Sequence, residues 1–223
     1  MNKMDIQYLK KVTVKVEIWS DVVCPWCYIG KRRFELALDK FEHKKDVSIE
    51  WKSFQLDPNT RPEPGVNIHQ SLARKKGWTE EYARQMNDHV TSLAAKVGLT
   101  YNFDKVVVAN TFDAHRLMQF AKKQGAGSAS EERLFKAYFT EGRNLNDHTT
   151  LVELGADIGL DPSQIATMLS TDECREDVEG DAYDAFQLGI HGVPFFVLNE
   201  KYGISGAQEP EVFLSSLQKA WTT

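Results

Sequence analysis

The sequence predicts an α/β protein in which two strand-containing ends enclose a long helical segment. Residues 12–54 alternate between strand-like, helix-like and strand-like patterns, and residues 66–188 contain helical patterns only. Strand-like patterns return in residues 193–205. With 223 residues and 42% hydrophobic composition, the chain can bury a core as one domain carrying an insertion.

The first pattern is a strand–helix–strand unit. Residues 12–19 alternate β-branched and polar side chains, which predicts a strand with one buried face. Apolar positions at helical spacing predict a helix over 25–41, and Pro25 suits its first position because that N–H has no helical partner. Residues 47–54 alternate again and end at a loop rich in proline, residues 57–65.

The middle of the chain contains start and stop signals for several helices. Thr79, Ser130 and Asp161 each precede a helical pattern and are candidate N-caps. Asp161 is the clearest, because a proline and a glutamine follow it at the first and third helical positions. The candidate helix stops are Gly98, Gly142, Gly159 and Gly189.

The C-terminal end predicts a β-hairpin and a helix. Residues 193–198 and 202–205 are the two strands, and an amphipathic helix follows over 210–221. We therefore divide the chain into an N-terminal part (12–65), a helical insertion (66–189) and a C-terminal part (190–223) that completes the fold begun by the first.

Composition and charge exclude several classes of partner. The formal net charge is −5 and the isoelectric point is near 5.7, so a nucleic-acid partner is not expected. No stretch approaches the roughly 20 apolar residues of a membrane span, and the first residues lack the apolar run of a secretory signal. We expect a soluble protein in the cytoplasm.

Two of the three cysteines, Cys24 and Cys27, stand at the predicted helix start and form a Cys-x-x-Cys motif. The free N–H groups of a helix N-terminus favour the thiolate, which is the form that attacks disulfides. Cys27, one turn later, is placed to attack a mixed disulfide on Cys24 and release the product. The motif therefore predicts a redox pair with Cys24 as nucleophile and Cys27 as resolving thiol.

Three further interpretations of the motif remain open at this stage. Half of a zinc site would need two further ligands, and the spacing of His43 and His69 does not make them ligands, so no metal is predicted. The two cysteines could also form a structural disulfide or remain inert thiols. Cys174 lies among acidic residues that disfavour a thiolate, and we interpret it as a bystander.

The motif Cys24-Pro25-Trp26-Cys27 after a strand, and Gly192-Val193-Pro194 before another, resemble the two signatures of the thioredoxin superfamily. The long helical segment makes the resemblance DsbA-like, and implies a thioredoxin fold with a large all-helical insertion. Four segments resemble the FrnE-like branch of DsbA proteins: residues 21–31, 109–116, 139–142 and 204–208. Together these segments extend over nearly the whole chain.

The resemblance also implies a substrate site. Val193-Pro194 is expected to be a cis peptide bond facing the cysteines, with the Val193 backbone pairing to an extended substrate, although the residues alone allow a plain turn. The other expected substrate-binding residues are Pro25, Trp26, Asn110, Thr111 and His115. Glu17 is a candidate for the buried acid that some DsbA proteins place under the cysteines, and a solvated strand glutamate is the alternative.

The leading functional prediction is a protein disulfide oxidoreductase that exchanges disulfides on protein or small thiol substrates. No metal or bound organic cofactor is expected, and glutathione is a candidate co-substrate. The first alternative is a glutathione-dependent isomerase or kappa-type glutathione transferase, of the 2-hydroxychromene-2-carboxylate isomerase kind. The second is a non-enzymatic module that binds polypeptides.

Overall fold

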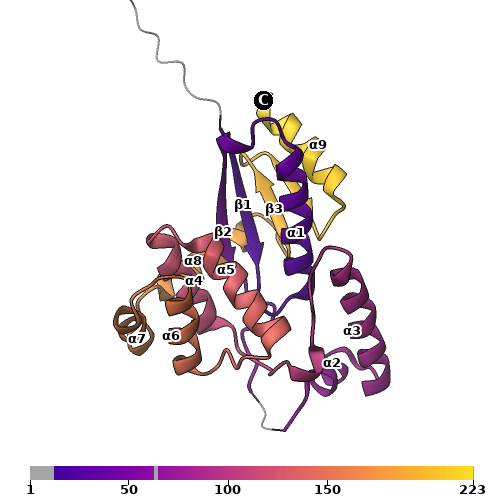
Figure 1. Ribbon diagram of the computed structural model, residues 1–223, viewed down its shortest axis with the longest axis vertical. Helices are drawn as coiled ribbons and strands as arrows, with labels where there is room; N and C mark the ends of the chain where they lie inside the picture. The colour runs from indigo at the N-terminus through magenta and orange to yellow at the C-terminus, as the bar shows by residue number, and fades with distance from the viewer. Residues whose placement is uncertain (1–12, 63–64, 223) are drawn as a thin grey trace, which may run out of the picture.

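The computed structural model describes residues 13–62 and 65–222 of the chain. In this described part, four strands form one mixed sheet in the order β2-β1-β3-β4, with β1 parallel to β2 and antiparallel to β3, and β3 antiparallel to β4 (Figure 1). The strands are β1 Val14–Ser20, β2 Val47–Ser53, β3 Phe195–Leu198 and β4 Tyr202–Ser205. This arrangement confirms the predicted α/β fold, with the helices between β2 and β3.

The helices that surround the sheet are α1 Pro25–Lys40, α2 Ile68–Lys76, α3 Glu80–Ala95, α4 Phe112–Lys123, α5 Gly127–Lys136, α6 His148–Asp157, α7 Pro162–Ser170, α8 Arg175–Gln187 and α9 Pro210–Trp221. Short helical turns occupy Lys44–Asp46 and Phe103–Lys105, and a π-helical turn, Ala137–Glu141, follows α5. Within the described residues, no helix combines the length and apolar character needed to cross a membrane.

Both faces of the sheet are covered by helices. Along each strand, successive side chains point to opposite faces, and apolar side chains on each face pack against these helices. On one face, Phe196 of β3 packs against Phe34 of α1 and Phe213 of α9, with ring centroids 5.6 and 4.6 Å from its own. On the other face, Trp19 packs with Ala185 of α8 and donates a hydrogen bond to the Asp181 carbonyl at 3.0 Å. Each face therefore holds its own apolar cluster.

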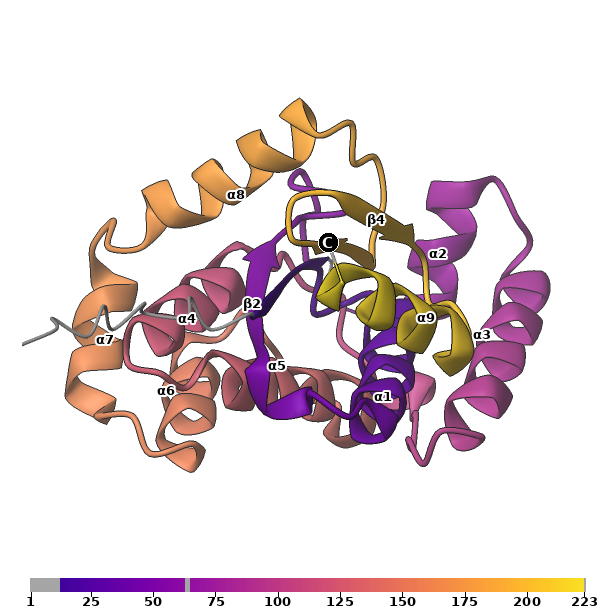
Figure 2. The same ribbon diagram turned by 90° about the horizontal axis from the view of Figure 1, so that it is seen from above.

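The helices α2 to α8 lie around the N-terminal end of α1, which follows β1. Figure 2 shows α2 and α3 on one side of α1, and α4 to α7 on the other. Contacts join α3 to α1, and both α5 and α8 to β2. Segments that are far apart in the sequence therefore meet where β1 ends and α1 begins.

Most helix starts lie where the sequence predicts them. The helix α1 begins at Pro25, and the caps of α3 and α7 are confirmed because Thr79 accepts a hydrogen bond from the Tyr82 N–H and Asp161 accepts from Ser163 and Gln164. The prediction for Ser130 is wrong: α5 begins at Gly127, so Ser130 lies within the helix and is buried.

The strands begin slightly later than predicted. Val12 lies outside the described residues, and β1 begins at Val14. The strand predicted from residue 193 begins at Phe195, because Val193 and Pro194 form the turn that enters it. Among the predicted helix stops, Gly142 has a φ of +69°, and a Cβ there would lie 2.6 Å from the Lys105 carbonyl oxygen. That site therefore requires glycine for two reasons.

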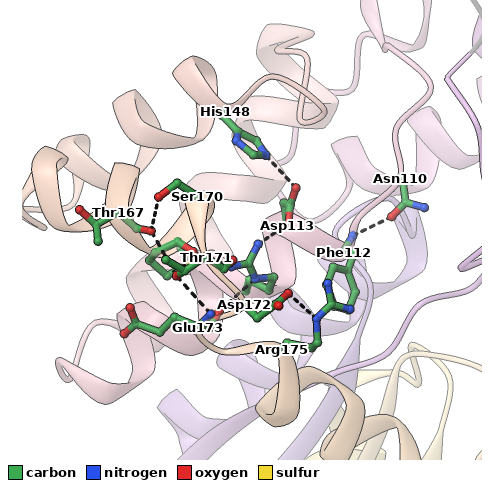
Figure 3. A network of polar contacts seen from close by, with 12 residues as sticks. Asn110, Phe112, Asp113, His148, Thr167, Ser170, Thr171, Asp172, Glu173 and Arg175 are labelled. Carbon is green, nitrogen blue, oxygen red and sulfur yellow. Dashed lines mark hydrogen bonds and ion pairs between the residues drawn. The ribbon is translucent and has the colours of Figure 1, made fainter.

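Arg116 of α4 joins three helices of the insertion from a buried position. Its guanidinium donates to the carbonyl oxygens of Met168 at 2.5 Å, Glu173 at 3.0 Å and Thr171, and forms an ion pair with Asp113 at 2.8 Å. Figure 3 shows Asp113, Thr171 and Glu173 converging on this point between α4, α7 and the start of α8. A single side chain thus satisfies the carbonyl groups where α7 ends.

We expect Arg116→Met to lower the free energy of unfolding by about 3 kcal/mol, because buried carbonyl groups and a carboxylate lose their partner. Arg175→Met is the matched control: Arg175 pairs with Asp172 and Glu179 nearby, but its side chain is 45% exposed. Its loss should lower the free energy of unfolding much less than the loss of Arg116, because solvent screens an exposed ion pair. Denaturant unfolding measures both, and equal effects of the two variants would contradict this role of Arg116.

Candidate active site

The two cysteines of the motif lie at the first turn of α1. Cys24 is the N-cap residue, with φ −89° and ψ 110°, and its carbonyl accepts a hydrogen bond from the Cys27 N–H at 3.0 Å. The Cys24 N–H donates to the Asp21 carbonyl at 2.9 Å, which fixes the turn between β1 and α1. Both are free thiols, and 4% of Cys24 and 1% of Cys27 is exposed.

The turn before β3 lies directly against the cysteines. The Cys24 thiol faces the Val193 carbonyl oxygen, with 3.6 Å between Sγ and O, and the Val193–Pro194 peptide bond is cis as the resemblance implies. Pro194 packs on α1 at Gly30, where an added Cβ would lie 3.0 Å from the Pro194 Cγ. Only a residue without a side chain allows this approach without displacing the turn.

Pro25 and Trp26, between the cysteines, have different surroundings. The Pro25 carbonyl accepts a hydrogen bond from the Tyr101 hydroxyl at 2.7 Å, which ties α1 to the segment after α3. Trp26 is 38% exposed, so its indole is available to a docking molecule. Burial, and then the charges of the cysteines, raise the pKa of Tyr101, which therefore stays a neutral donor.

A cleft of about 470 Å³ opens beside the motif. Its lining includes Asp21 and Val23 from the turn before Cys24, and Thr111 at the start of α4. Lys75 and Lys76 from the end of α2 also line it. The cleft therefore combines a wall next to the redox pair with cationic side chains.

The predicted substrate residues just before the start of α4 are not both at the surface of this cleft. Thr111 lines it, whereas Asn110 is engaged with the protein itself: its amide donates to the carbonyl oxygens of Pro58 and Thr60, and its oxygen accepts from the Phe112 N–H. Asn110 thereby holds the loop after β2. The structure therefore gives Asn110 a role in stabilising this loop.

His115 lies in the interior, with no exposed surface. Its Nε2 is 3.4 Å from the Asp21 Oδ1, which is an ion-pair distance without hydrogen-bond geometry. Burial lowers the pKa of His115, but Asp21, followed by Glu131 and Asp181, raises it by more, so the net shift is upward. The structure therefore gives His115 a place behind the redox pair and no surface for a substrate.

A buried hydroxyl and carboxyl group lie on the inner side of Cys27. Ser20, the last residue of β1, donates to Glu131 of α5 at 2.6 Å. Burial, and next the neighbouring Cys24, raise the pKa of Cys27 well above its usual value, whereas the Asp21 backbone and the Ser20 hydroxyl act in the opposite direction. Sequence reasoning missed Ser20 and Glu131, since no local pattern connects residues 111 positions apart.

Glu17 and Cys174 have other surroundings. Glu17 accepts from Lys15 at 2.9 Å and lies 4.0 Å from Lys52, on the face of β1 opposite to Ser20. Cys174 is buried at the start of α8, where its sulfur is 3.6 Å from the Lys123 Nζ. Among the residues that the structure describes, no group of three His, Cys, Asp or Glu side chains is arranged to hold a metal ion.

Comparison with known proteins identifies the family. The family model of the DSBA-like thioredoxin domain matches residues 15–218, which includes both the motif and the Val193–Pro194 turn. The chain belongs to the DSBA-like thioredoxin family. As a DSBA-like protein it carries the thioredoxin sheet, formed by β1 to β4, with α2 to α8 inserted between β2 and β3.

Individual relatives agree with this assignment. A crystal structure of the probable DsbA oxidoreductase SCO1869 from Streptomyces coelicolor is 40% identical, with a TM-score of 0.89, and covers 94% of this chain and 90% of that one. The uncharacterized protein YwbO of Bacillus subtilis (strain 168) is 30% identical over 205 residues, 91% of this chain and 94% of its own. The cytosolic disulfide reductase DsbM from Pseudomonas aeruginosa, solved with GSH, shares the fold at 18% identity and a TM-score of 0.66, over 94% of this chain and 100% of that one.

A cluster of ionic groups fastens the active-site helix of this DSBA-like protein to α5. The Glu132 carboxylate accepts hydrogen bonds from Tyr28 and Lys31, each at 2.7 Å, and from Arg32. Burial acts to raise the pKa of Glu132, but hydrogen bonds from Arg32, Lys31 and Tyr28 lower it to about 2.

The lowered pKa of Glu132 predicts a pH-dependent contribution to stability. The contribution is full above the unfolded-state pKa of about 4.3 and is lost as the pH falls toward 2, because protonation removes the charge that the cations bind. Glu132→Gln should therefore lower the free energy of unfolding by about 1–2 kcal/mol at neutral pH, discounted for a partly exposed group, and by progressively less below about pH 4.5. A difference that stayed constant down to about pH 3 in denaturant titrations would contradict this role.

Proposed function

We propose that this protein is a thiol–disulfide oxidoreductase that exchanges disulfides on protein or small thiol substrates through Cys24 and Cys27. The observation that carries the proposal is the pair of free thiols at the start of α1, with Cys24 as the N-cap residue and facing the Val193 carbonyl. The helix N-terminus supplies partial positive charge where a thiolate is needed. Membership of the DSBA-like family supports this chemistry.

The reaction needs only the two sulfurs and the substrate. The Cys24 thiolate attacks one sulfur of a substrate disulfide, forming a mixed disulfide and releasing one thiolate. Cys27 then attacks the Cys24 sulfur, which forms the Cys24–Cys27 disulfide and releases the second substrate thiolate. Two electrons pass to the substrate, and the reverse sequence oxidises a dithiol; the direction depends on reduction potentials, where about 30 mV corresponds to 1.4 kcal/mol.

The proposed substrate site combines two surfaces beside Cys24. Trp26, Val193 and Pro194, with Pro25, flank the motif, and Thr111 lines the adjoining cleft. Extended polypeptides would pair with the Val193 backbone. The cleft is lined by Asp21 and Asp57 as well as by two lysines, and Lys75 pairs with Asp57 at 2.7 Å, which leaves Lys76 as the cation for a carboxylate of a small anionic thiol. We propose glutathione as a co-substrate with no resident cofactor.

Two finer assignments belong to this proposal. We place the protein in the FrnE-like branch, supported by the four segments noted in the sequence, and in the cytoplasm, in line with the cytosolic reductase DsbM. Cell fractionation tests the location. Against a glutathione-dependent isomerase or kappa-type transferase, the chain keeps two thiols where those enzymes typically have a serine or one cysteine.

We expect Cys24→Ser to abolish reduction of insulin disulfides, and Cys27→Ser to accumulate mixed disulfides through Cys24, because resolution then lacks an internal thiol. Turnover assays and non-reducing mass spectrometry measure the two effects. Cys174→Ser is the matched control and should behave as the wild type. Unchanged insulin reduction in Cys24→Ser would refute the proposed function, and unchanged peptide binding with no turnover in the wild type would favour a binding module.

A further inference from the structure

The outer face of α8 exposes large apolar side chains to solvent. Phe186 is 70% exposed, Tyr183 is 63% exposed, and Leu188, which directly follows the helix, is 57% exposed. Figure 2 shows α8 along the outside of the molecule, on the side away from α1. Because Tyr183 and Phe186 are three residues apart on one helix, their side chains are neighbours. Exposed apolar side chains that gather in this way indicate a contact surface for another molecule.

An apolar groove lies beside this face. It has a volume of about 140 Å³ and lies between α8 and the loop that follows β2. Phe54 and Pro58 line it from the loop, and Val178 and Ala182 line it from the helix. Ala182 is one turn before Phe186, so the two lie on the same side of α8. We call the groove and the exposed aromatic side chains next to it the α8 surface.

The α8 surface is continuous with the redox centre. Phe54, which lines the groove, is partly exposed and packs against the apolar cluster around Trp19. Val193 is also partly exposed and packs against the same cluster. The carbonyl oxygen of Val193 faces the Cys24 sulfur at 3.6 Å. A polypeptide that reacts at Cys24 can therefore extend past Val193 and Phe54 onto α8.

The α8 surface is also acidic. Of the 13 residues of α8, five are acidic and one, Arg175, is basic. Glu179 lines the groove, and Glu176 lies two turns before Tyr183 on the same side of the helix. The single arginine is shared, because it pairs with Asp172 as well as with Glu179. The surface therefore attracts cationic partners and repels anionic ones.

We propose that the α8 surface binds the segment of a polypeptide substrate that flanks its reacting cysteine, and that it selects segments combining apolar and basic side chains. This inference rests on the proposed disulfide exchange and names a class of substrate for it. Apolar side chains of the substrate pack on Phe186 and in the groove. Its lysine or arginine side chains pair with Glu176 and Glu179.

The charge of the α8 surface argues against other occupants. A symmetric dimer through α8 would place the acidic residues of one copy against those of the other, because a two-fold contact uses the same face twice. Glutathione is anionic, and its proposed place is the cleft that Lys76 lines. A basic and apolar polypeptide matches both the charge and the apolar character of the surface.

The experiment compares peptide disulfides with a small disulfide in single turnover. The basic peptide contains one cysteine flanked by leucine and lysine residues, its acidic counterpart has glutamate in place of lysine, and each is joined to nitrothiobenzoate by a disulfide. Dithiobis(nitrobenzoate) is the small disulfide. In a Cys174→Ser background, the Cys24 thiolate attacks the peptide sulfur and forms a mixed disulfide, and nitrothiobenzoate leaves as a coloured thiolate. Its absorbance gives the second-order rate constant.

The variants separate apolar contact from charge. The first combines Tyr183→Ser with Phe186→Ser, and the second combines Glu176→Gln with Glu179→Gln. Matched controls are Tyr82→Ser, at a tyrosine of α3 that is 45% exposed, and Glu81→Gln beside it.

We expect the double serine variant to react about tenfold more slowly with the basic peptide, because the aromatic contact is lost, and to lose far less of its rate with dithiobis(nitrobenzoate). The wild type should prefer the basic to the acidic peptide by about tenfold at low salt, and this preference should shrink as salt is added. The double glutamine variant should retain only part of the preference. Both α3 controls should match the wild type with all three disulfides.

A double serine variant that reacts with both peptides as fast as the wild type would overturn the α8 surface as a substrate site and leave the proposed function intact. If that variant does not fold, the double glutamine variant decides, and an unchanged preference for the basic peptide overturns the inference. A wild type that dimerises in sedimentation experiments, while the double serine variant stays monomeric, would assign the surface to a second copy instead. A wild type that reacts with none of the three disulfides would overturn the proposed function.

Discussion

The packing of the first two turns of α1 against other segments is the constraint on which the redox centre depends. The Pro194 turn packs on Gly30, the Tyr101 hydroxyl holds the Pro25 carbonyl, and Glu132 of α5 binds the cations of the second turn. These contacts come from three segments that are distant in sequence. The partial positive charge of a helix N-terminus acts only within the first turn. Small changes in this packing therefore change the electrostatic field at Cys24.

The helical insertion therefore does more than cover the sheet. It contributes Glu132 at the outer side of α1, and Glu131 and His115 behind the cysteines. Glu131 and His115 are buried, and each shifts the pKa of the other because little water separates them. In this arrangement the two parts of the chain share one redox centre, and neither contains it alone.

The sequence predicts those features that depend on neighbouring residues. The helix start at Pro25 and the N-cap at Asp161 depend only on neighbouring residues, and both predictions are confirmed. The prediction that Ser130 is an N-cap is wrong because tertiary packing, which the neighbouring residues do not reveal, places Ser130 inside α5. The pairing of Ser20 with Glu131 could not be predicted, since it arises only when α5 packs beside β2. Strand alternation does, however, place Glu17 on the face opposite to Ser20.

The Val193 carbonyl lies where the proposed substrate docking site meets the Cys24 sulfur. In the dithiol state this oxygen faces the Cys24 thiol, which can donate to it at 3.6 Å. A thiolate has no proton to donate, so ionisation of Cys24 removes the donor from the oxygen. Under the proposed docking, the same oxygen accepts a hydrogen bond from the substrate backbone. A carbonyl oxygen has two lone pairs, so the Val193 oxygen can accept from the Cys24 thiol and from a substrate backbone together, and a substrate strand paired there lies beside the attacking sulfur.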